Sequence, residues 1–328
     1  MRKLGRNGPS VYILGLGCMG MSGMYGPADR QEATRTIHAA LDAGINLLDT
    51  GDFYGAGHNE LLIGEAVKGR PRDSFHVSVK FGALRDPEGG WHGNDARPEA
   101  IGNFLSYTLN RLWLDYIDVY RPAQLDPSVP IEETIGAIAE WVKKGYVRHI
   151  DLSEVGPETI RRAAAIHPIS DLQIEYSLIS RGIEDKILPT TRELGISITA
   201  YGVLSRGLIS GHWSKDKALT GDFRGHTPRF SEGNIDRNLA LVEALRRIVE
   251  ARGISVAQAA IAWVAAQGED IVPLVGSRRQ DQLAEALGSL DVALSDEDLA
   301  AIEQAVPKDA AAGARYGEMQ MAQLDSER

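Results

Sequence analysis

The chain has 328 residues, of which 43% are hydrophobic and 24% are charged, and its formal net charge is -10. This length is enough for one large α/β domain with a well-buried core, while the acidic balance argues against a duplex-binding surface, which needs clustered Lys and Arg. The single cysteine, Cys18, excludes an internal disulfide and a cysteine-based zinc finger. Since no apolar run is long enough to span a bilayer, we expect a cytoplasmic protein with no membrane or nucleic-acid partner and no metal.

Eight short apolar or β-branched runs recur along the chain, and each is typical of a buried strand. They cover residues 11–17, 45–50, 75–81, 115–120, 147–153, 172–177, 196–202 and 270–276. Segments with helical periodicity lie between them. The first of these follows Asp29, a suitable N-cap, and stops at Gly44. Another, residues 130–145, has acidic residues in its first turn and lysines in its last, an order that matches the helix dipole.

Strands and helices alternate at spacings of roughly 25 to 40 residues, which favours a closed (β/α)8 TIM barrel over an open doubly wound sheet. We expect one domain over residues 1–328, opened by a short N-terminal β-hairpin. The gap before the last strand is long and holds a loop at 208–233 rich in Gly and His, then helical segments at 234–253 and 255–268. Long loops in compact domains are usually functional. We expect the tail, about residues 306–328, to pack near a substrate pocket.

The sequence contains the glycine spacing of a dinucleotide-binding fingerprint, but the residues that follow it do not fit that function. Gly15, Gly17 and Gly20 spell G-x-G-x-x-G directly after a strand, as in a Rossmann fold. The following MSGMYGPAD contains two more glycines and Pro27, which prevent the immediate helix that would hold a pyrophosphate. We therefore interpret the glycines as a close-approach loop at the mouth of the barrel.

Three residues at the ends of the second and third strands form a candidate catalytic set. In a barrel the chemistry lies at the carboxyl ends of the strands, where Asp49, Tyr54 and Lys80 fall. A carbonyl that accepts hydride must also receive a proton, and a Tyr hydroxyl donates poorly at neutral pH unless a cation stabilises its phenolate. Lys80 is the cation within reach, and Asp49 would keep it charged. The alternative is a structural Asp-Lys pair with Tyr54 as packing.

Further segments, in order along roughly residues 1–305, resemble the aldo-keto reductase superfamily. They are DTGDFYGAGHNE (49–60), SVKFG (78–82), VPIEETIGAIAEWVKKGYVRHI (129–150) with LSE (152–154), QIEYS (173–177) and VGSRR (275–279). The resemblance implies a (β/α)8 barrel that binds extended NADP(H) across the strand ends and reduces carbonyls. It implies that Tyr54 is the general acid, that Lys80 lowers its pKa and that Asp49 is their partner.

The resemblance also implies cofactor contacts. Ser153 and Gln173 correspond to the residues that hydrogen-bond the nicotinamide carboxamide, and Tyr201 corresponds to the aromatic residue that stacks on the ring. The loop 203–211, with Leu204 and Arg206, corresponds to the segment that covers the pyrophosphate. The 2'-phosphate site corresponds to Ser277, Arg278 and Arg279, and the adenine contact corresponds to Glu285. The 2'-phosphate site favours NADP(H) over NAD(H). Gln282 and Ala286 stand where the family often has Arg and Asn, which weakens that preference.

Two departures concern the barrel interior. Ala123 stands where most of the family has a His that hydrogen-bonds the substrate carbonyl, and Asp151 stands where Gly is usual. Strand alternation places Arg121 in the interior, and Asp151 on the same face as Ser153 and one layer deeper. We expect an interior ion pair between Arg121 and Asp151. The alternative is an Asp151 of no consequence, and a separation above about 5 Å would exclude the pair.

The substrate is left open, with a small or pyridoxal-type aldehyde as one candidate. Ala123 is a small residue before the run QLDPSVP at 124–130. This arrangement resembles some pyridoxal-reducing members of the superfamily, which have a small residue before a similar R/Q-x-DP-x-VP run. The expected pocket residues are Met21, Phe53, Trp91, Arg121 and Ala123. Because the His is missing, a weakly catalytic NADP(H)-binding redox sensor or regulatory subunit is the second hypothesis. A TIM-barrel lyase or isomerase without a nucleotide is the third. Self-association is not indicated either way.

Overall fold

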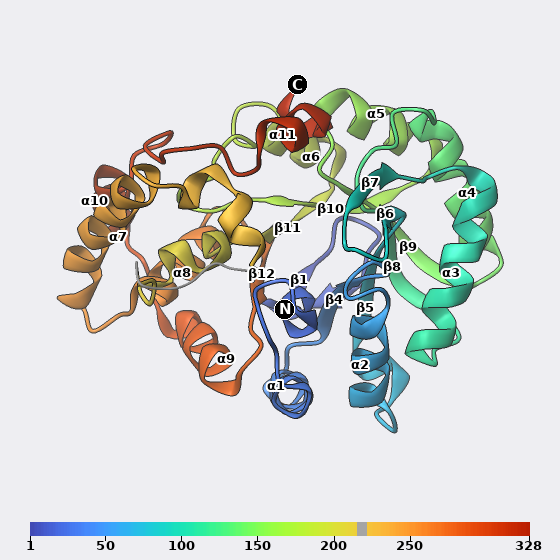
Figure 1. Cartoon of the computed structure of the whole chain (residues 1–328), viewed down its shortest axis with the longest axis horizontal. Helices are drawn as coiled ribbons and strands as arrows, with labels where there is room; N and C mark the ends of the chain where they lie inside the picture. The colour runs from blue at the N-terminus through green and yellow to red at the C-terminus, as the bar shows by residue number, and fades with distance from the viewer. Residues whose placement is uncertain (215–221) are drawn as a thin grey trace.

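The computed structural model describes residues 1–214 and 222–328, and eight parallel strands close into a barrel within it (Figure 1). The barrel order is β3-β4-β5-β8-β9-β10-β11-β12, and β12 pairs with β3 to close the ring. The strands are β3 Gly15–Gly17, β4 Leu47–Gly51, β5 His76–Phe81, β8 Ile117–Pro122, β9 Val147–Ser153, β10 Ile169–Glu175, β11 Ser197–Tyr201 and β12 Ile271–Gly276. The predicted (β/α)8 barrel is confirmed.

Helices follow the strands and cover the outside of the barrel. Their bounds are α1 Arg30–Asp42, α2 His58–Val67, α3 Pro98–Leu112, α4 Ile131–Lys143, α5 Pro157–Ile166, α6 Ile187–Leu194, α7 Asn234–Glu250, α8 Val256–Ala266, α9 Gln280–Leu287, α10 Asp296–Ala305 and α11 Glu318–Gln323. The Asp29 side chain caps α1 by accepting from the N–H of Glu32 at 2.7 Å. The capping signal in the sequence therefore located the start of α1, and the acidic and basic ends predicted for residues 130–145 match those of α4.

The first predicted strand, residues 11–17, is divided in the structure. β1 (Arg2–Lys3) and β2 (Ser10–Val11) form the expected N-terminal hairpin, and only β3 joins the barrel. Between the two, the backbone N–H of Tyr12 donates to Asn46 Oδ1 at 2.8 Å, which holds the chain against the start of β4. The hairpin buries Leu4 and Val11 against Leu47, Val119 and Val272 from three barrel strands. This apolar contact closes the end of the barrel opposite the site.

The connection after Gly17 confirms that the glycine fingerprint is not a Rossmann turn. A short 3-10 helix, η1 (Met19–Ser22), follows β3, and α1 begins only at Arg30. The long connection between β11 and β12 holds η3 (Ser205–Ser210), η4 (Phe223–His226) and η5 (Pro228–Phe230), then α7 and α8 as expected. Part of the predicted loop at 208–233, residues 215–221, lies outside the described residues.

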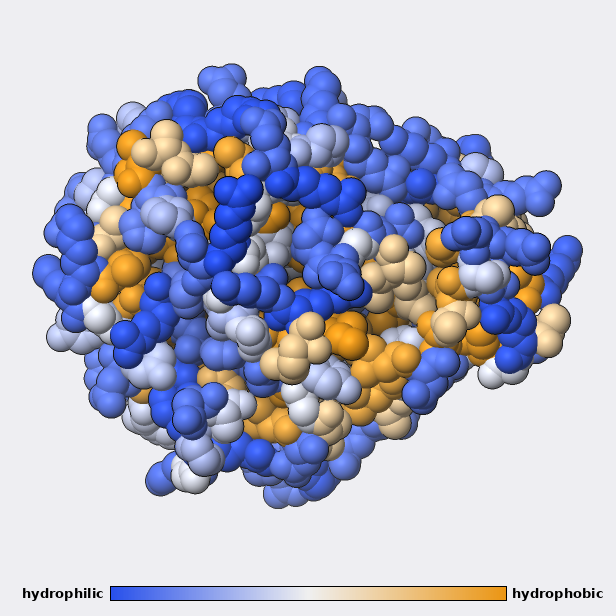
Figure 2. Space-filling model, turned by 180° about the vertical axis from the view of Figure 1, so that it is seen from behind, coloured by the Kyte–Doolittle hydropathy of each residue, from blue (hydrophilic) through white to orange (hydrophobic). Residues whose placement is uncertain are grey.

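Two more features frame the carboxyl ends of the strands. The antiparallel strands β6 (Ala83–Arg85) and β7 (Trp91–Asn94) form a hairpin after β5, and the tail after α10 crosses to α11 beside the start of α5 (Figure 1). Seen from behind, the surface is largely hydrophilic with several separate apolar patches (Figure 2). Among the described residues, no helix has the length and apolar character needed to cross a membrane.

Candidate active site

Three polar side chains meet inside the barrel near the ends of β4, β5 and β10. The Lys80 Nζ atom lies 2.6 Å from Asp49 Oδ2 and donates to Gln173 Oε1 at 2.8 Å. The Gln173 amide nitrogen donates in turn to Asp49 Oδ1 at 2.8 Å, which closes a triangle of buried groups. Burial lowers the pKa of Lys80 to about 8, and the Asp49 carboxylate opposes this change. The ammonium group therefore stays charged at neutral pH.

Tyr54 lies in the turn after β4, next to the same lysine. The Lys80 Nζ atom is 5.2 Å from the centroid of the Tyr54 ring, and the tyrosine is buried. Burial, and then the Asp49 carboxylate, raise the pKa of Tyr54 well above its ordinary value, while Arg121 opposes them. The phenol therefore carries its proton at neutral pH, as a proton donor must. The structure brings the expected catalytic residues together, but the lowering of the Tyr54 pKa by Lys80 stays a prediction.

One layer deeper, Arg121 spans the barrel interior and contacts three carboxylates. Its Nη2 atom donates to Asp49 Oδ1 at 3.2 Å and also to Ser78 Oγ. Its Nη1 atom lies 3.3 Å from Asp171 Oδ2 and 3.5 Å from Asp151 Oδ2. The side chain is 1% exposed, so the inward orientation predicted for Arg121 is confirmed. The ion pair expected between Arg121 and Asp151 is confirmed as well.

Asp171 belongs to this cluster, although no expectation named it. The signal was present in the sequence, because Asp171 precedes Gln173 by two residues on β10 and alternation puts both on the interior face. Burial raises the pKa of Asp171 to about 6, with Arg121 opposing the change. Burial, and then Asp171, raise the pKa of Asp151 well above its ordinary value. The cluster therefore retains protons at pH values where exposed aspartates are ionised.

The two side chains expected to bind a carboxamide are neighbours. Ser153 and Gln173 are partners in the register of β9 and β10, and both are buried. Within the described parts of the chain, the Ser153 hydroxyl forms no hydrogen bond, whereas the Gln173 amide is engaged at both ends. Ser153 is therefore available to an outside ligand. Gln173 holds the catalytic pair in the structure, and its contact with a nicotinamide stays a prediction.

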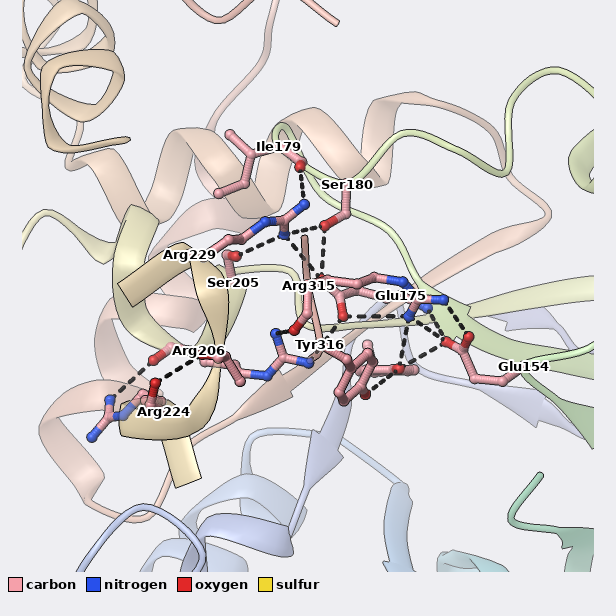
Figure 3. A network of polar contacts seen from close by, with 12 residues as sticks. Glu154, Glu175, Ile179, Ser180, Ser205, Arg206, Arg224, Arg229, Arg315 and Tyr316 are labelled. Carbon is pink, nitrogen blue, oxygen red and sulfur yellow. Dashed lines mark hydrogen bonds and ion pairs between the residues drawn. The ribbon is translucent and has the colours of Figure 1, made fainter. Parts of the chain in front are cut away.

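Tyr201, the expected stacking aromatic, is tied to the C-terminal tail. Its hydroxyl donates to Glu154 Oε1 at 2.7 Å and lies 2.9 Å from the hydroxyl of Tyr316. Arg315 reinforces the link, since its Nη2 atom lies 2.5 Å from Glu154 Oε2 (Figure 3). Glu154 itself has a φ of 53°, a left-handed conformation that residues other than glycine seldom adopt. The tail thus packs on the ends of β9 and β11, but its contact with a substrate stays a prediction.

Glu175, at the end of β10, contacts three arginines that come from distant segments of the chain (Figure 3). Its carboxylate lies 3.2 Å from Arg206, 3.3 Å from Arg229 and 3.5 Å from Arg315. Burial raises the pKa of Glu175, but the three arginines outweigh this effect and lower it to about 2. Leu204, at the start of the same turn as Arg206, packs against the hydrophobic core. The pyrophosphate contact expected of this turn stays a prediction.

The turn from β12 into α9 contains the expected 2'-phosphate residues. Ser277 is 2% exposed, and its Oγ atom has no hydrogen-bond partner among the residues that the structure describes. Arg278 donates to the carbonyl oxygen of Tyr25 at 3.1 Å, and Arg279 lies 2.8 Å from the Asp281 carboxylate. A buried hydroxyl without a partner costs free energy unless a ligand satisfies it. Ser277 therefore fits a phosphate oxygen, whereas both arginines already have partners.

Glu285, the expected adenine contact, lies on α9 and faces the connection after β11. Its Oε2 atom is 2.9 Å from His212 Nε2. The imidazole is 68% exposed, so this contact contributes little stability by itself. It does place the segment after η3 beside α9. The predicted role of Glu285 toward adenine is not tested by this contact.

The expected substrate residues divide into an aromatic edge and buried positions. The Phe53 ring lies 4.7 Å from the Tyr54 ring and 5.6 Å from the Trp91 ring, measured between centroids. Trp91 is 42% exposed and comes from the β6–β7 hairpin, so this hairpin reaches the side of Tyr54. Ala123 is 7% exposed, whereas Met21 is 1% exposed and packs in the hydrophobic core. The aromatic edge is thus the accessible part of the expected pocket.

Comparison with known proteins identifies the family. The sequence model of the aldo/keto reductase family matches residues 13–307. The chain belongs to this family. It is 43% identical over 317 residues to a Glycine max protein named as a probable aldo-keto reductase, covering 96% of this chain and 91% of the relative. It is 38% identical over 321 residues to a Schizosaccharomyces pombe protein named as an NADP(+) aldo-keto reductase, covering 96% and 94%.

Solved structures agree with this aldo-keto reductase assignment. A glycerol dehydrogenase from Gluconobacter oxydans superposes with a TM-score of 0.84 at 30% identity, covering 93% of this chain and 94% of that chain. An aldo-keto reductase from Klebsiella pneumoniae in complex with NADPH gives a TM-score of 0.73 at 25% identity, covering 94% and 96%. The resemblance carried by the motifs is therefore confirmed.

Proposed function

We propose that the chain is an NADP(H)-dependent reductase of aldehydes or ketones in which Tyr54 donates the proton. The observation that carries this proposal is the buried group of Asp49, Tyr54 and Lys80, with a 2.6 Å contact between Lys80 and Asp49. The group lies at neighbouring strand ends in a member of the aldo-keto reductase family. The name of the S. pombe relative and the NADPH complex of the K. pneumoniae structure support the choice of cofactor.

The residues present fit this cofactor. Bound NADPH would supply the hydride. Neither the Ser153 hydroxyl nor the buried Ser277 Oγ atom has a hydrogen-bond partner in the described ranges, 1–214 and 222–328. The first suits the carboxamide of the cofactor, and the second suits a phosphate oxygen. As negative charge develops on the carbonyl oxygen, the Tyr54 phenol passes its proton to that oxygen, and the Lys80 ammonium stabilises the phenolate that is left. Asp49 keeps Lys80 charged and fixed in position.

The catalytic group works without the usual His, because Ala123 occupies that position. Arg121 does not replace the His, since its guanidinium faces the deeper carboxylates. Substrate orientation therefore falls to Tyr54 and to the aromatic edge of Phe53 and Trp91. This edge suits a planar aldehyde, and a pyridoxal-type compound is one candidate.

The test compares wild type with Tyr54→Phe and with Tyr107→Phe, a control on an exposed tyrosine of α3. NADPH oxidation is followed by absorbance with pyridoxal and a panel of simple aldehydes. Cofactor affinity is measured separately by quenching of tryptophan fluorescence. Loss of the proton donor should reduce turnover by about 10²- to 10⁴-fold and leave NADPH affinity unchanged, while the control keeps full activity.

Two results would contradict the proposal. Full turnover in Tyr54→Phe would remove Tyr54 as the proton donor. Tight NADPH binding without reduction of any aldehyde would instead favour a cofactor-sensing protein, the class that the missing His keeps open.

A further inference from the structure

Glu32, in the first turn of α1, reaches the start of α9. Its Oε1 atom accepts a hydrogen bond from the backbone N–H of Gln280, the first residue of α9, at 3.0 Å. Its Oε2 atom accepts from Arg35 Nε at 3.1 Å and from Arg35 Nη2 at 2.8 Å. The hydrogen bond from Gln280, and then those from Arg35, lower the pKa of Glu32. A carboxylate that is paired with Arg35 therefore lies at the N-terminus of α9.

The other anion-binding groups of this turn are also occupied by side chains of the chain itself. The backbone N–H of Arg278 donates to Gln282 Oε1 at 3.2 Å, and the Arg279 guanidinium pairs with Asp281 at 2.8 Å. Ser277 is the exception, because its buried Oγ atom has no partner among the described residues. The turn is thus built for an anion, and the Glu32 carboxylate holds one of its N–H groups.

We infer that Glu32 sets the balance between NADPH and NADH in this chain, an inference that rests on the proposed function. A helix N-terminus attracts an anion, and the 2'-phosphate of NADPH is the anion expected beside Ser277. A phosphate that takes the N–H of Gln280 must displace the Glu32 carboxylate, and a phosphate held by Ser277 alone lies in the same turn as that carboxylate. Like charges repel.

The 2'-hydroxyl of NADH has the opposite preference. A hydroxyl donates a hydrogen bond to a carboxylate, which is how an acidic residue recognises the ribose of NAD in dinucleotide-binding folds. Glu32 therefore weakens NADPH binding and supports NADH binding. The chain accepts the two cofactors more evenly than Arg278 and Arg279 would suggest from the sequence alone.

The decisive variant is Glu32→Gln, because glutamine keeps an oxygen for the Gln280 N–H but removes the charge. Dissociation constants for NADPH and NADH are measured by quenching of tryptophan fluorescence, without any substrate. The ratio Kd(NADH)/Kd(NADPH) should rise by about two- to fivefold, the size expected of one charge contact at a protein surface. The rise should shrink in high salt, since exposed charges are screened.

Asp42→Asn is the matched control. Asp42 is the last residue of α1 and pairs at the surface with Arg70, so this variant makes the same charge change on the same helix away from α9. Its Kd ratio should equal that of the wild type. A second readout is competition by adenosine 2',5'-bisphosphate, which should bind Glu32→Gln more tightly than wild type.

The outcomes separate this inference from the proposed function. If the wild type binds NADPH and Glu32→Gln leaves the ratio unchanged, the role of Glu32 is wrong and the reductase proposal stands. An equal rise in Asp42→Asn would also overturn it, because net helix charge and not the Gln280 contact would then be the cause. If the wild type binds neither cofactor, both proposals fail.

Discussion

Removal of Arg121 should destabilise the fold, and the loss should grow as the pH rises. The Arg121→Met variant keeps a long side chain but leaves Asp49, Asp151 and Asp171 in the barrel interior without their guanidinium. Arg121 is 1% exposed and the three carboxylates are at most 4% exposed, so solvent cannot replace the lost charge. The carboxyl groups can avoid the cost only by keeping protons.

The direction of this pH dependence follows from the pKa of Asp171. Its folded pKa is about 6 against an ordinary 3.8, so the folded state holds this proton more tightly than the unfolded chain does. The resulting stabilisation is present at low pH and is lost as the pH rises from the ordinary pKa to the folded pKa. In the wild type this loss is complete near pH 6. Arg121 lowers this pKa, so in its absence the proton is retained above pH 6 and stability continues to fall.

The size of this pH-dependent loss of stability is set by the number of protons that the folded variant retains. One proton held by the folded variant and absent from the unfolded chain costs about 1.4 kcal/mol per pH unit. Over the two units from pH 6 to pH 8, the free energy of unfolding should therefore fall by roughly 3 kcal/mol more in Arg121→Met than in wild type. This approaches the loss of about 3 to 5 kcal/mol expected when one partner of a buried ion pair is removed.

Urea unfolding followed by tryptophan fluorescence at pH 6 and pH 8 measures this difference. Arg192→Met is the control, because Arg192 pairs with Asp270 at the surface, with side chains 45% and 31% exposed. The control should cost under about 1 kcal/mol at both pH values. An equal loss for Arg121→Met at both pH values would refute the reasoning, since the carboxylates would then take up no proton.

Three further predictions concern the site. The kcat for aldehyde reduction should fall as the pH rises through about 8, where Lys80 loses its charge. The pH profile of kcat for Lys80→Met should lack this fall. If the variant keeps the fall near pH 8, another group is responsible for it. Trp91→Ala should raise KM for aromatic aldehydes by about three- to tenfold through loss of its contact beside Phe53, with kcat nearly unchanged; an unchanged KM would place the substrate elsewhere. Arg315→Met should leave the buried Glu154 carboxylate without its arginine and loosen the tail, so limited proteolysis should cut residues 306–328 faster. Tm should fall by about 4 to 7 °C, the shift that a loss of about 3 to 5 kcal/mol gives in a chain of this length; equal cleavage rates would show that Arg315 does not hold the tail.

Local patterns of apolar residues in the sequence predicted much of the fold. The eight apolar runs predicted the eight barrel strands because parallel strands covered on both faces need apolar side chains throughout. The exception was the first run, which the structure divides at residues 12–14. Val11 in the hairpin and Leu16 in the barrel wall are both buried and apolar, so the pattern could not distinguish a hairpin at the barrel end from a strand in its wall.

The candidate site was predictable to the extent that it follows strand ends. Asp49, Tyr54 and Lys80 could be placed together because barrel geometry brings the ends of β4 and β5 side by side. Alternation placed Arg121 in the interior, and the same rule applied to β10 would have added Asp171. Glu154 and Glu175 lay inside quoted motifs, but nothing local indicated that arginines would converge on them.

The sequence by itself determined the barrel strands after the first and the main helices between them. It thereby determined which polar side chains stand at the mouth of the barrel, because periodicity and capping act over a few residues. Only the tertiary structure decided which of them are partners. Arg315 meets Glu154 across 161 positions and Glu32 meets Gln280 across 248. Such pairs form because closing the barrel brings distant strand ends and loops together. Burial and charge then select the partner, and neither is encoded in the residues next to it in the chain.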